Sequence, residues 1–306
     1  MTRPLPTLQR KPYPAYTWLG LAILLGGELA LNLDVAWVAV WFTPIMWSGF
    51  ILFGDGLLAR ARGESWLTTR RAEFPFLALA SVLIWLLFEV YNFRIQNWLY
   101  RELPASAIVR DLGYFWAFAT IAPAVLIAAE LFGALLVSRQ PRARPPRKLL
   151  LGPGWIWVLL GFAMVTIPPL LPVPVARFTF GFVWIGFIPL LDPINQRLGS
   201  PSLRSELSAG TYRTLLALLL GGLLCGLLWE AWNFQALGHG GGHWIYTVPE
   251  ELRIFNLHYG QMPVLGMLGF PPFAVELYVL YLTLRNVFEV GRIMGPWQLS
   301  GGKVRD

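Results

Sequence analysis

Two related stretches decide how this chain is organised: "EVYNFRIQNWLY" over residues 89–100 and "EAWNFQALGHGGGHWIY" over residues 230–246. Both open with E-x-x-N-F and both close with W-x-Y, while only the second carries the added glycines and histidines. Residues three apart share one face of a helix, so the glutamate and asparagine of each copy lie on the same face. A motif that occurs twice in one chain predicts a duplicated architecture.

The composition indicates that most of the surface faces lipid. The 306 residues are 56% hydrophobic and only 13% charged, whereas a soluble domain has about a quarter of its residues charged. The apolar residues fall in blocks of about 20, the length that a helix needs to cross a hydrocarbon core of roughly 30 Å. The 15 tryptophans and 10 tyrosines are typical of membrane–water boundaries. We therefore predict an all-α integral membrane protein.

Eight apolar blocks are candidates for transmembrane helices. The prolines of "PPLLPVP" (168–174) predict a turn between the fifth and sixth blocks, because proline breaks a helix. The blocks cover residues 17–33, 36–58, 74–93, 112–137, 154–172, 176–195, 213–234 and 263–290. The first is expected to be a retained helix and not a cleaved signal peptide.

The basic residues predict an orientation. Of the 24 lysines and arginines, all but Arg94, Arg101, Arg110, Arg177 and Arg253 fall in segments on the same side of the membrane as both termini. Positive charge collects on the cytoplasmic side, so both termini are expected in the cytoplasm, with the bacterial inner membrane as the expected location. Short basic loops between apolar blocks do not form a nucleic-acid-binding face.

Further matching blocks extend the duplication over the whole chain. "WSGFILFGD" (47–55) matches "WIGFIPLLD" (184–192), and "AELF" (129–132) matches "VELY" (275–278). We predict two tandem four-helix repeats, residues 16–138 and 153–290, between an N-terminal segment (1–15), a basic linker (139–152) and a C-terminal tail (291–306). Four helices per repeat give both halves the same direction, with a site expected where the halves meet.

The acidic residues inside the apolar blocks are the strongest candidates for function, because a charged group at bilayer depth costs several kcal/mol. Glu89 and Glu230 lie near the outer ends of their blocks, and Glu130 and Glu276 lie deeper. No basic residue lies well inside a block to neutralise them, so each carboxyl is expected to be protonated or hydrogen-bonded. A protonated carboxyl is a proton donor. Hydrogen bonds that merely tie helices together explain the E-x-x-N pairs equally well.

Differences between the two copies favour the second as the chemical one. Arg94 follows Glu89 by five residues, whereas the uncharged Gln235 follows Glu230. Pro272 precedes Glu276 by one turn, and a broken helix beside a buried acid is a recurring binding device in membranes. The predicted catalytic residues are Glu230, Asn233 and Glu276, and the predicted substrate-binding residues are Glu89, Asn92, Glu130, Trp229, Trp232, Trp244 and Tyr246.

The three histidines lie in the outer loop of the second half. His239, His243 and His258, with Glu250 or Glu251, are enough ligands for a metal. The glycine-rich spacing instead favours a loop that covers a site. Two further acids, Asp55 and Asp192, end their apolar blocks at the cytoplasmic face and are expected to pair with loop arginines such as Arg60 or Arg197.

Three classes of function fit this pattern. The first is an intramembrane enzyme that acts on an apolar lipid or isoprenoid by carboxylate acid–base chemistry, with aromatic faces stabilising a developing carbocation. The helix count and the proline near a glutamate resemble integral-membrane lycopene cyclase domains, but no diagnostic block is present and the family is not assigned. The alternatives are a proton-coupled transporter, and a non-catalytic subunit that binds a pigment, a quinone or a partner protein.

The expected partners are membrane lipid and an apolar small molecule between the repeats, and no particular cofactor is indicated. The chain has no glycine-rich phosphate loop, no nucleophile elbow and no cysteine-based metal cluster. These absences exclude the common classes of soluble enzyme.

Overall fold

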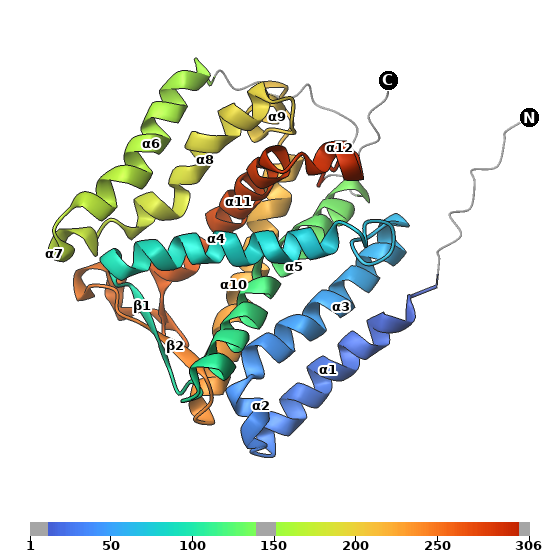
Figure 1. The fold of residues 1–306 in the computed structure, drawn as a ribbon, viewed down its shortest axis with the longest axis vertical. Helices are drawn as coiled ribbons and strands as arrows, with labels where there is room; N and C mark the ends of the chain where they lie inside the picture. Colours follow the sequence, from blue (N-terminus) through green and yellow to red (C-terminus); the bar gives the residue numbers. More distant parts are fainter. Residues whose placement is uncertain (1–11, 139–150, 300–306) are drawn as a thin grey trace, which may run out of the picture.

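The computed structural model describes residues 12–138 and 151–299, so the expected segments 1–15, 139–152 and 291–306 lie partly outside it. The described chain is almost entirely helical, as predicted (Figure 1). The helices are α1 (Ala15–Asn32), α2 (Ala36–Val40), α3 (Phe42–Arg62), α4 (Phe74–Ile95), α5 (Ala107–Ser138), α6 (Gly154–Leu170), α7 (Val173–Ala176), α8 (Phe180–Arg197), α9 (Leu203–Ser208), α10 (Arg213–Gly238), α11 (Val264–Val287) and α12 (Val290–Met294). Short 3₁₀ turns cover Glu250–Leu252 and Ile254–Asn256.

Six of the described helices are long and apolar enough to cross a membrane: α1, α3, α4, α5, α10 and α11. They identify a multi-pass helical membrane protein. The eight expected spans are not confirmed, because the fifth and sixth form shorter or more polar helices. The fifth, α6, has 17 residues and ends just after Pro168 and Pro169. The sixth, α8, closes with the polar run from Asn195 to Arg197.

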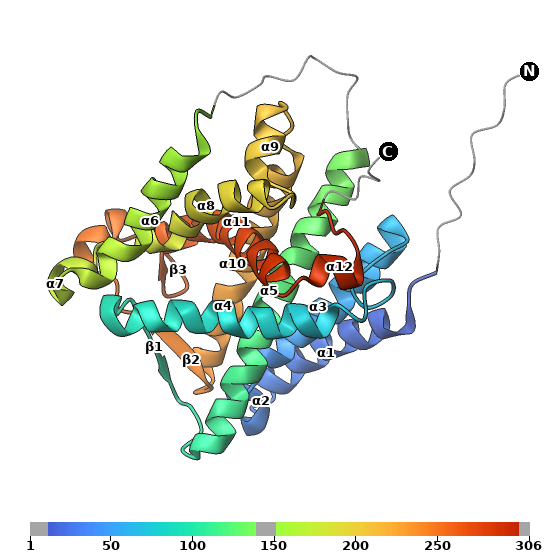
Figure 2. The ribbon, with the colours of Figure 1, turned by 45° about the horizontal axis from the view of Figure 1, so that its top comes forward.

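Helix packing joins the two halves along α5 and α10. In the first half α1 packs on α3, and both α3 and α4 pack on α5. In the second half α6 packs on α8, and both α8 and α10 pack on α11. Across the halves α5 and α10 run side by side (Figures 1 and 2). A Cβ at Gly221 would lie 2.6 Å from the backbone nitrogen of Ala129, so only glycine permits this approach.

Two short strands also connect the halves. Strand β1 (Trp98–Arg101) follows α4, strand β2 (His243–Tyr246) follows α10, and the two pair antiparallel. In their register Trp98 faces Tyr246, and Tyr100 faces Trp244. A second, two-residue pair joins β3 (His258–Tyr259) to β4 (Met262–Pro263). We call the side of the bundle with β1 and β2 the strand end; α12 and the start of α1 lie on the far side, the termini end (Figure 1).

The aspartates that end the repeated W-x-G-F-I blocks cap the following loops. Asp55 accepts hydrogen bonds from the Ser65 hydroxyl at 2.7 Å and the Trp66 amide at 2.8 Å. Asp192 accepts them from the Ser202 hydroxyl at 3.1 Å and the Leu203 amide at 2.9 Å. In both cases the donors lie 10 and 11 residues further along the chain. Loop amides and hydroxyls therefore provide the hydrogen bonds at both carboxylates, and the charge of Arg204 acts on Asp192 in addition.

Candidate functional site

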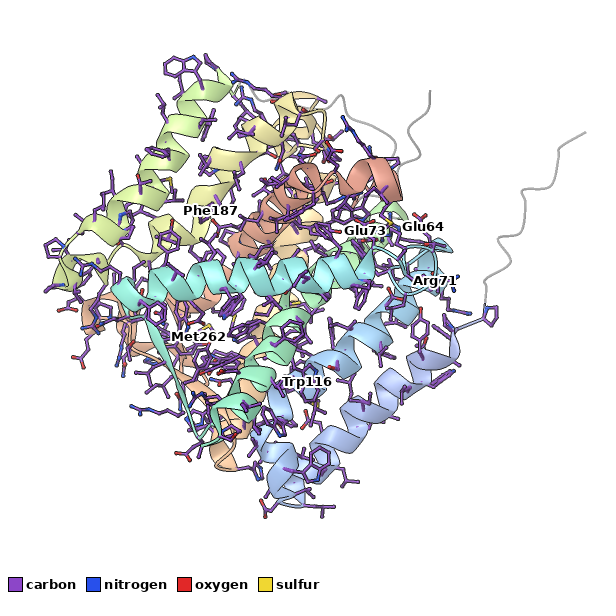
Figure 3. The ribbon with its side chains drawn as sticks, viewed as in Figure 1. Glu64, Arg71, Glu73, Trp116, Phe187 and Met262 are labelled. Carbon is purple, nitrogen blue, oxygen red and sulfur yellow. The ribbon has the colours of Figure 1, made fainter. Side chains whose placement is uncertain are left out.

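A cavity of about 370 Å³ lies between the two halves at the strand end. Its walls come from α3, α4 and α5 of the first half, from α8, α10 and α11 of the second, and from both paired strands. This volume falls in the range of small-molecule sites. Met262, a buried wall residue, is labelled in Figure 3 on the side of α4 where the strands lie.

Aromatic side chains dominate the walls of the cavity. The six tryptophans are Trp47, Trp85, Trp98, Trp184, Trp229 and Trp244, and the other aromatic residues are Tyr100, Phe118, Phe178, Phe180, Tyr246 and Phe270. Several of these rings contact one another, as in the edge-on pair of Trp229 and Trp244, whose centroids are 5.3 Å apart. Such walls suit an apolar or planar molecule.

The Glu89 carboxylate lies behind one wall of the cavity and is held by three donors. The hydroxyl of Tyr100 donates to Oε1 at 2.5 Å, and the indole N–H groups of Trp85 and Trp98 donate to the same oxygen at 2.8 and 3.1 Å. The side chain is half-buried. Tyr100, Trp85 and Trp98 all line the cavity, whereas Glu89 does not. Its partners therefore separate this carboxylate from the ligand space.

The Glu230 carboxylate is fully buried and is held from two sides. Tyr246 donates its hydroxyl to Oε2 at 3.0 Å, and the backbone amide of Gln261 donates to Oε1 at 2.6 Å. The Tyr246 hydroxyl also accepts the indole N–H of Trp244 at 2.7 Å. Both Tyr246 and Trp244 line the cavity. The structure thus brings together the predicted residues Glu230, Trp244 and Tyr246.

The two tyrosine hydroxyls are the link between the carboxylates and the cavity. Burial, reinforced by the neighbouring Glu89, raises the pKa of Tyr100 well above its usual value. Burial and Glu230 raise the pKa of Tyr246 in the same way. Both phenols therefore keep their protons at neutral pH. Each donates its one hydrogen to the carboxylate behind it, so the polar atom that each brings to the cavity wall is the phenol oxygen.

The two asparagines of the E-x-x-N motif clamp the strands to their helices. Asn92 donates to the carbonyl of Trp98 at 2.8 Å and accepts from the amide of the same residue at 3.3 Å. Asn233 does the same with Trp244, at 3.0 and 2.9 Å. Both asparagines thus position the tryptophan and the tyrosine two residues beyond it. The Asn233 amide uses its oxygen and one N–H for Trp244. Its side chain also lies close enough to the Glu230 carboxylate to interact with it.

Glu276 and Trp232 lie outside the cavity lining. The Oε1 atom of Glu276 accepts the backbone amide of Phe187 at 3.0 Å, and its Oε2 atom is buried without a partner among the described residues. Phe187 is labelled on α8 in Figure 3. Trp232 packs edge-on against Trp47, with ring centroids 4.8 Å apart. Of the two glutamates predicted for catalysis, only Glu230 forms a hydrogen bond with a side chain of the cavity wall.

Glu130 lies at the termini end and has the basic neighbours that the sequence did not predict. Arg62 donates to it at 2.8 Å and Arg70 at 2.9 Å. The indole of Trp297, near the end of the described chain, adds a hydrogen bond at 3.2 Å. The expectation of an unpaired acid is wrong here because both arginines enter from the polar end of α3 and the loop that follows.

A second buried ion pair stands beside Glu130. Glu73 accepts from Arg285 at 3.2 Å and from the hydroxyl of Tyr281 at 2.6 Å. Figure 3 labels Glu73 at the end of α4 nearest α12. The pair joins the start of α4 to α11 and so connects the halves at the termini end. Removing either partner of such a pair is strongly destabilising, because it leaves an uncompensated charge in the interior.

The three histidines do not converge. His239 contacts Asp34 at 2.9 Å, His243 is buried with Nδ1 2.9 Å from the carbonyl of Gly241, and His258 is exposed. Within residues 12–138 and 151–299, no group of three histidine, cysteine or acidic side chains has the geometry to hold a metal.

One side of the cavity is exposed. The exposed wall residues are Phe178 and Gly181 at the start of α8, and Leu265 and Gly266 at the start of α11. Neighbouring side chains on these two helices, such as Phe182 and Leu268, are also exposed and apolar. The exposed side is therefore a gap between two helix ends with an apolar rim.

The sequence named Trp229, Trp244 and Tyr246 but missed much of the site. Trp98 and Tyr100 occupy the first W-x-Y, and Trp47 and Trp184 open the repeated W-x-G-F-I blocks. Projecting Trp244 and Tyr246 onto the first W-x-Y would have found Trp98 and Tyr100, whereas Trp47 and Trp184 had no predicted counterpart to project. Trp85 and Arg177 carry no such signal, since neither lies in a repeated block. No protein-family model matches this chain, and no curated protein and no solved structure matches it either.

Proposed function

We propose that this protein is an intramembrane enzyme that transfers a proton to or from an apolar lipid or isoprenoid bound between its two halves. The observation that carries the proposal is the aromatic cavity whose wall holds the hydroxyl of Tyr246, itself bonded to the buried carboxylate of Glu230. A buried acid that reaches an apolar cavity through a tyrosine is suited to general acid–base catalysis.

The hydrogen bonds define a path for the proton. Glu230 does not line the cavity, so a proton that moves between its carboxyl and the ligand passes through Tyr246. Because the phenol donates to the carboxylate, the phenol oxygen takes a proton from the ligand as its own proton moves to Glu230. A protonated Glu230 reverses both transfers and protonates the ligand. Trp229 and Trp244 present aromatic rings to the same space, and such rings stabilise positive charge that develops on a protonated double bond.

The gap between α8 and α11 supports entry from the membrane. Its rim is apolar, with Phe178 and Leu265 exposed. A substrate dissolved in lipid can reach the cavity sideways without crossing water. A proton-coupled carrier needs instead a polar path that opens to water on each side in turn, and a lining that is mostly apolar does not favour one.

We also propose the duplication, the orientation and the eight spans as parts of this reading. The duplication is supported by the corresponding helix pairs, by the two asparagine clamps and by the two aspartate caps with equal spacing. The cytoplasmic placement of both termini is supported by the arginines of the termini end, Arg62, Arg70 and Arg285 among them. In this reading α6 and α8 cross the bilayer as a pair.

Non-catalytic binding of a quinone or pigment is the second candidate, and the six tryptophans of the wall favour it. Flat conjugated molecules stack on indole rings without needing an acid. This candidate predicts a tightly bound ligand that leaves the protein unchanged.

Deuterium incorporation tests the enzyme proposal even while the substrate is unidentified. The protein is reconstituted in bilayers of a bacterial lipid extract in D₂O, and the lipids are then analysed by mass spectrometry. We expect one class of unsaturated lipid to gain deuterium with time, because the transferred proton comes from groups that exchange with solvent. A bound ligand without any gain over protein-free bilayers would reject the enzyme and favour the binding subunit.

A matched tyrosine variant controls for folding. Tyr246→Phe removes the hydroxyl at the cavity and is expected to abolish incorporation. Tyr91→Phe removes a hydroxyl that donates to the carbonyl of Val165, away from the cavity, and is expected to leave incorporation intact. Equal loss in both variants would show that the readout follows stability and not chemistry.

A further inference from the structure

We propose that the cavity takes an amphipathic ligand whose anionic oxygen head group is bound by Arg177, with Arg253 beside it. This inference deepens the proposed function, on which it rests, by naming the class of substrate. It starts from the polar atoms of a wall that is otherwise apolar.

Arg177 is the basic residue of the cavity wall, and part of its guanidinium is unused. Nη2 donates to the carbonyl of Thr247 at 2.7 Å, which fixes the side chain in place. Nε is buried and has no partner among the described residues. A buried donor without an acceptor costs about 1–3 kcal/mol. An oxygen of a bound head group would remove this cost.

Asn97 supplies a complementary unpartnered atom on the same wall. Its amide nitrogen donates to the carbonyl of Arg177 at 3.2 Å, so its side chain lies against the same segment. Its Oδ1 atom is buried and unpartnered in the described chain. Arg177 Nε needs an acceptor and Asn97 Oδ1 needs a donor, and a phosphate monoester that keeps one proton offers both.

Arg253 repeats the pattern next to the cavity. It donates weakly to the carbonyl of Val248 at 3.4 Å, and its Nε is also buried without a described partner. Val248 and Leu252, on either side of the preceding turn, both line the cavity. Among the described residues neither Arg177 nor Arg253 forms an ion pair with a carboxylate, although Glu250 and Glu251 stand close in sequence.

The position of these groups fits a lipid-borne substrate. Arg177 and the exposed Phe178 are adjacent in sequence, so the charged group lies beside the apolar gap between α8 and α11. A head group held there leaves the chain of the ligand pointing into the aromatic cavity. Arginine binds phosphate and carboxylate oxygens with charge-assisted hydrogen bonds, which are stronger than neutral ones.

Binding of two matched probes tests the inference. Farnesyl phosphate and farnesol share one apolar chain and differ in the head group, and binding to the full-length protein in phosphatidylcholine nanodiscs is followed by tryptophan fluorescence. We expect wild-type protein to prefer farnesyl phosphate by roughly tenfold to a hundredfold. Arg177→Met should remove most of that preference while farnesol still binds. Arg101→Met, at an exposed residue of β1, should keep it.

Further arms separate the possible failures. If Arg177→Met does not fold, Arg253→Met gives the same test. The expected loss of preference for farnesyl phosphate is smaller, because the long bond to Val248 holds the Arg253 side chain less firmly in place. Equal affinity for both probes in wild-type protein would overturn the head-group assignment and leave the proposed function standing. Binding of neither probe would overturn both. If inorganic phosphate bound as tightly as farnesyl phosphate, the farnesyl group of the ligand would contribute nothing to binding. The aromatic cavity would then not be the binding site.

Discussion

Glu89 and Glu230 begin the same E-x-x-N-F motif, yet their carboxylates are held in different ways. Glu89 is half-buried, and three side chains donate to one of its oxygens. Glu230 is fully buried and receives one tyrosine hydroxyl and one backbone amide on different oxygens. Side chains alone hold the first carboxylate, two indoles and one phenol on a single oxygen, whereas a backbone amide from a loop helps to hold the second.

The longer connection of the second copy explains this difference. The loop between β2 and α11 returns over α10 and delivers the amide of Gln261 to Glu230. Gly260, just before it, has φ +59°, and a Cβ there would lie 2.5 Å from the Glu230 carboxylate. The first copy has Trp85 where the second has Gly226, whose space is filled by Phe270. The tyrosine contact and the asparagine clamp are therefore common to both sites, and the other donors to the carboxylate differ.

The largest expected difference between the two sites is in activity. Glu230→Gln removes the acid that we assign to the reaction and should lower deuterium incorporation by about a hundredfold to ten-thousandfold, the usual range for a general acid. Glu89→Gln should lower it far less. Equal losses of activity in both variants, with unchanged folding, would contradict the assignment of the acid to Glu230 alone.

Gly260→Ala should cause the largest loss of stability, about 3 kcal/mol. The substitution places a side chain at positive φ and forces it against Glu230. Gly240→Ala is the matched control, because it has φ +64° but no atom within 4 Å of the added Cβ. It should cost about 1 kcal/mol from the backbone conformation alone. Unfolding in mixed SDS micelles measures both, and similar values would contradict the close contact.

The asparagine clamps should contribute less, and unequally. Asn233 is completely buried and Asn92 is half-buried. Asn233→Ala leaves two buried backbone groups of Trp244 unpaired and should lower the free energy of unfolding by about 2 kcal/mol, and Asn92→Ala by about 1 kcal/mol. A stable but inactive Asn233→Ala variant would restore the role in catalysis that the sequence predicted for this residue.

Trp85→Phe should have an effect as small as that of Asn92→Ala. It removes one of three donors to Glu89, and Trp98 and Tyr100 continue to hold the same oxygen. We expect a loss of about 1 kcal/mol in the free energy of unfolding, measured in the same micelles. A loss as large as that of Gly260→Ala would show that the two remaining donors do not hold the carboxylate.

The sequence predicted the helical membrane fold from the length of its apolar blocks. It also singled out Glu230, Trp244 and Tyr246, because the W-x-Y that ends each motif is a local pattern. It did not predict that Asn92 and Asn233 bind the backbone of the following strand, since the spacing of side chains on a helix says nothing about where the chain turns back. The paired strands β1 and β2 depend on contacts between halves that no local pattern contains.

The ion pairs at the termini end could not be predicted from the sequence either, because they join residues that are far apart along the chain. Glu130 lies 60 residues from Arg70 and 68 from Arg62. The block around Glu130 looks free of basic residues until the helices are packed. Arg177 was counted only for the orientation of the chain, because a lone arginine in a proline-rich turn has no pattern that connects it to a distant cavity.

The most direct test of the account is an electron cryomicroscopy map of the protein extracted from its own membranes with the surrounding lipid retained. We expect elongated density inside the cavity, in contact with Trp229 and the hydroxyl of Tyr246, entering between α8 and α11. A cavity filled by rearranged side chains, with Tyr100 and Tyr246 turned away from Glu89 and Glu230, would contradict a ligand site between the halves.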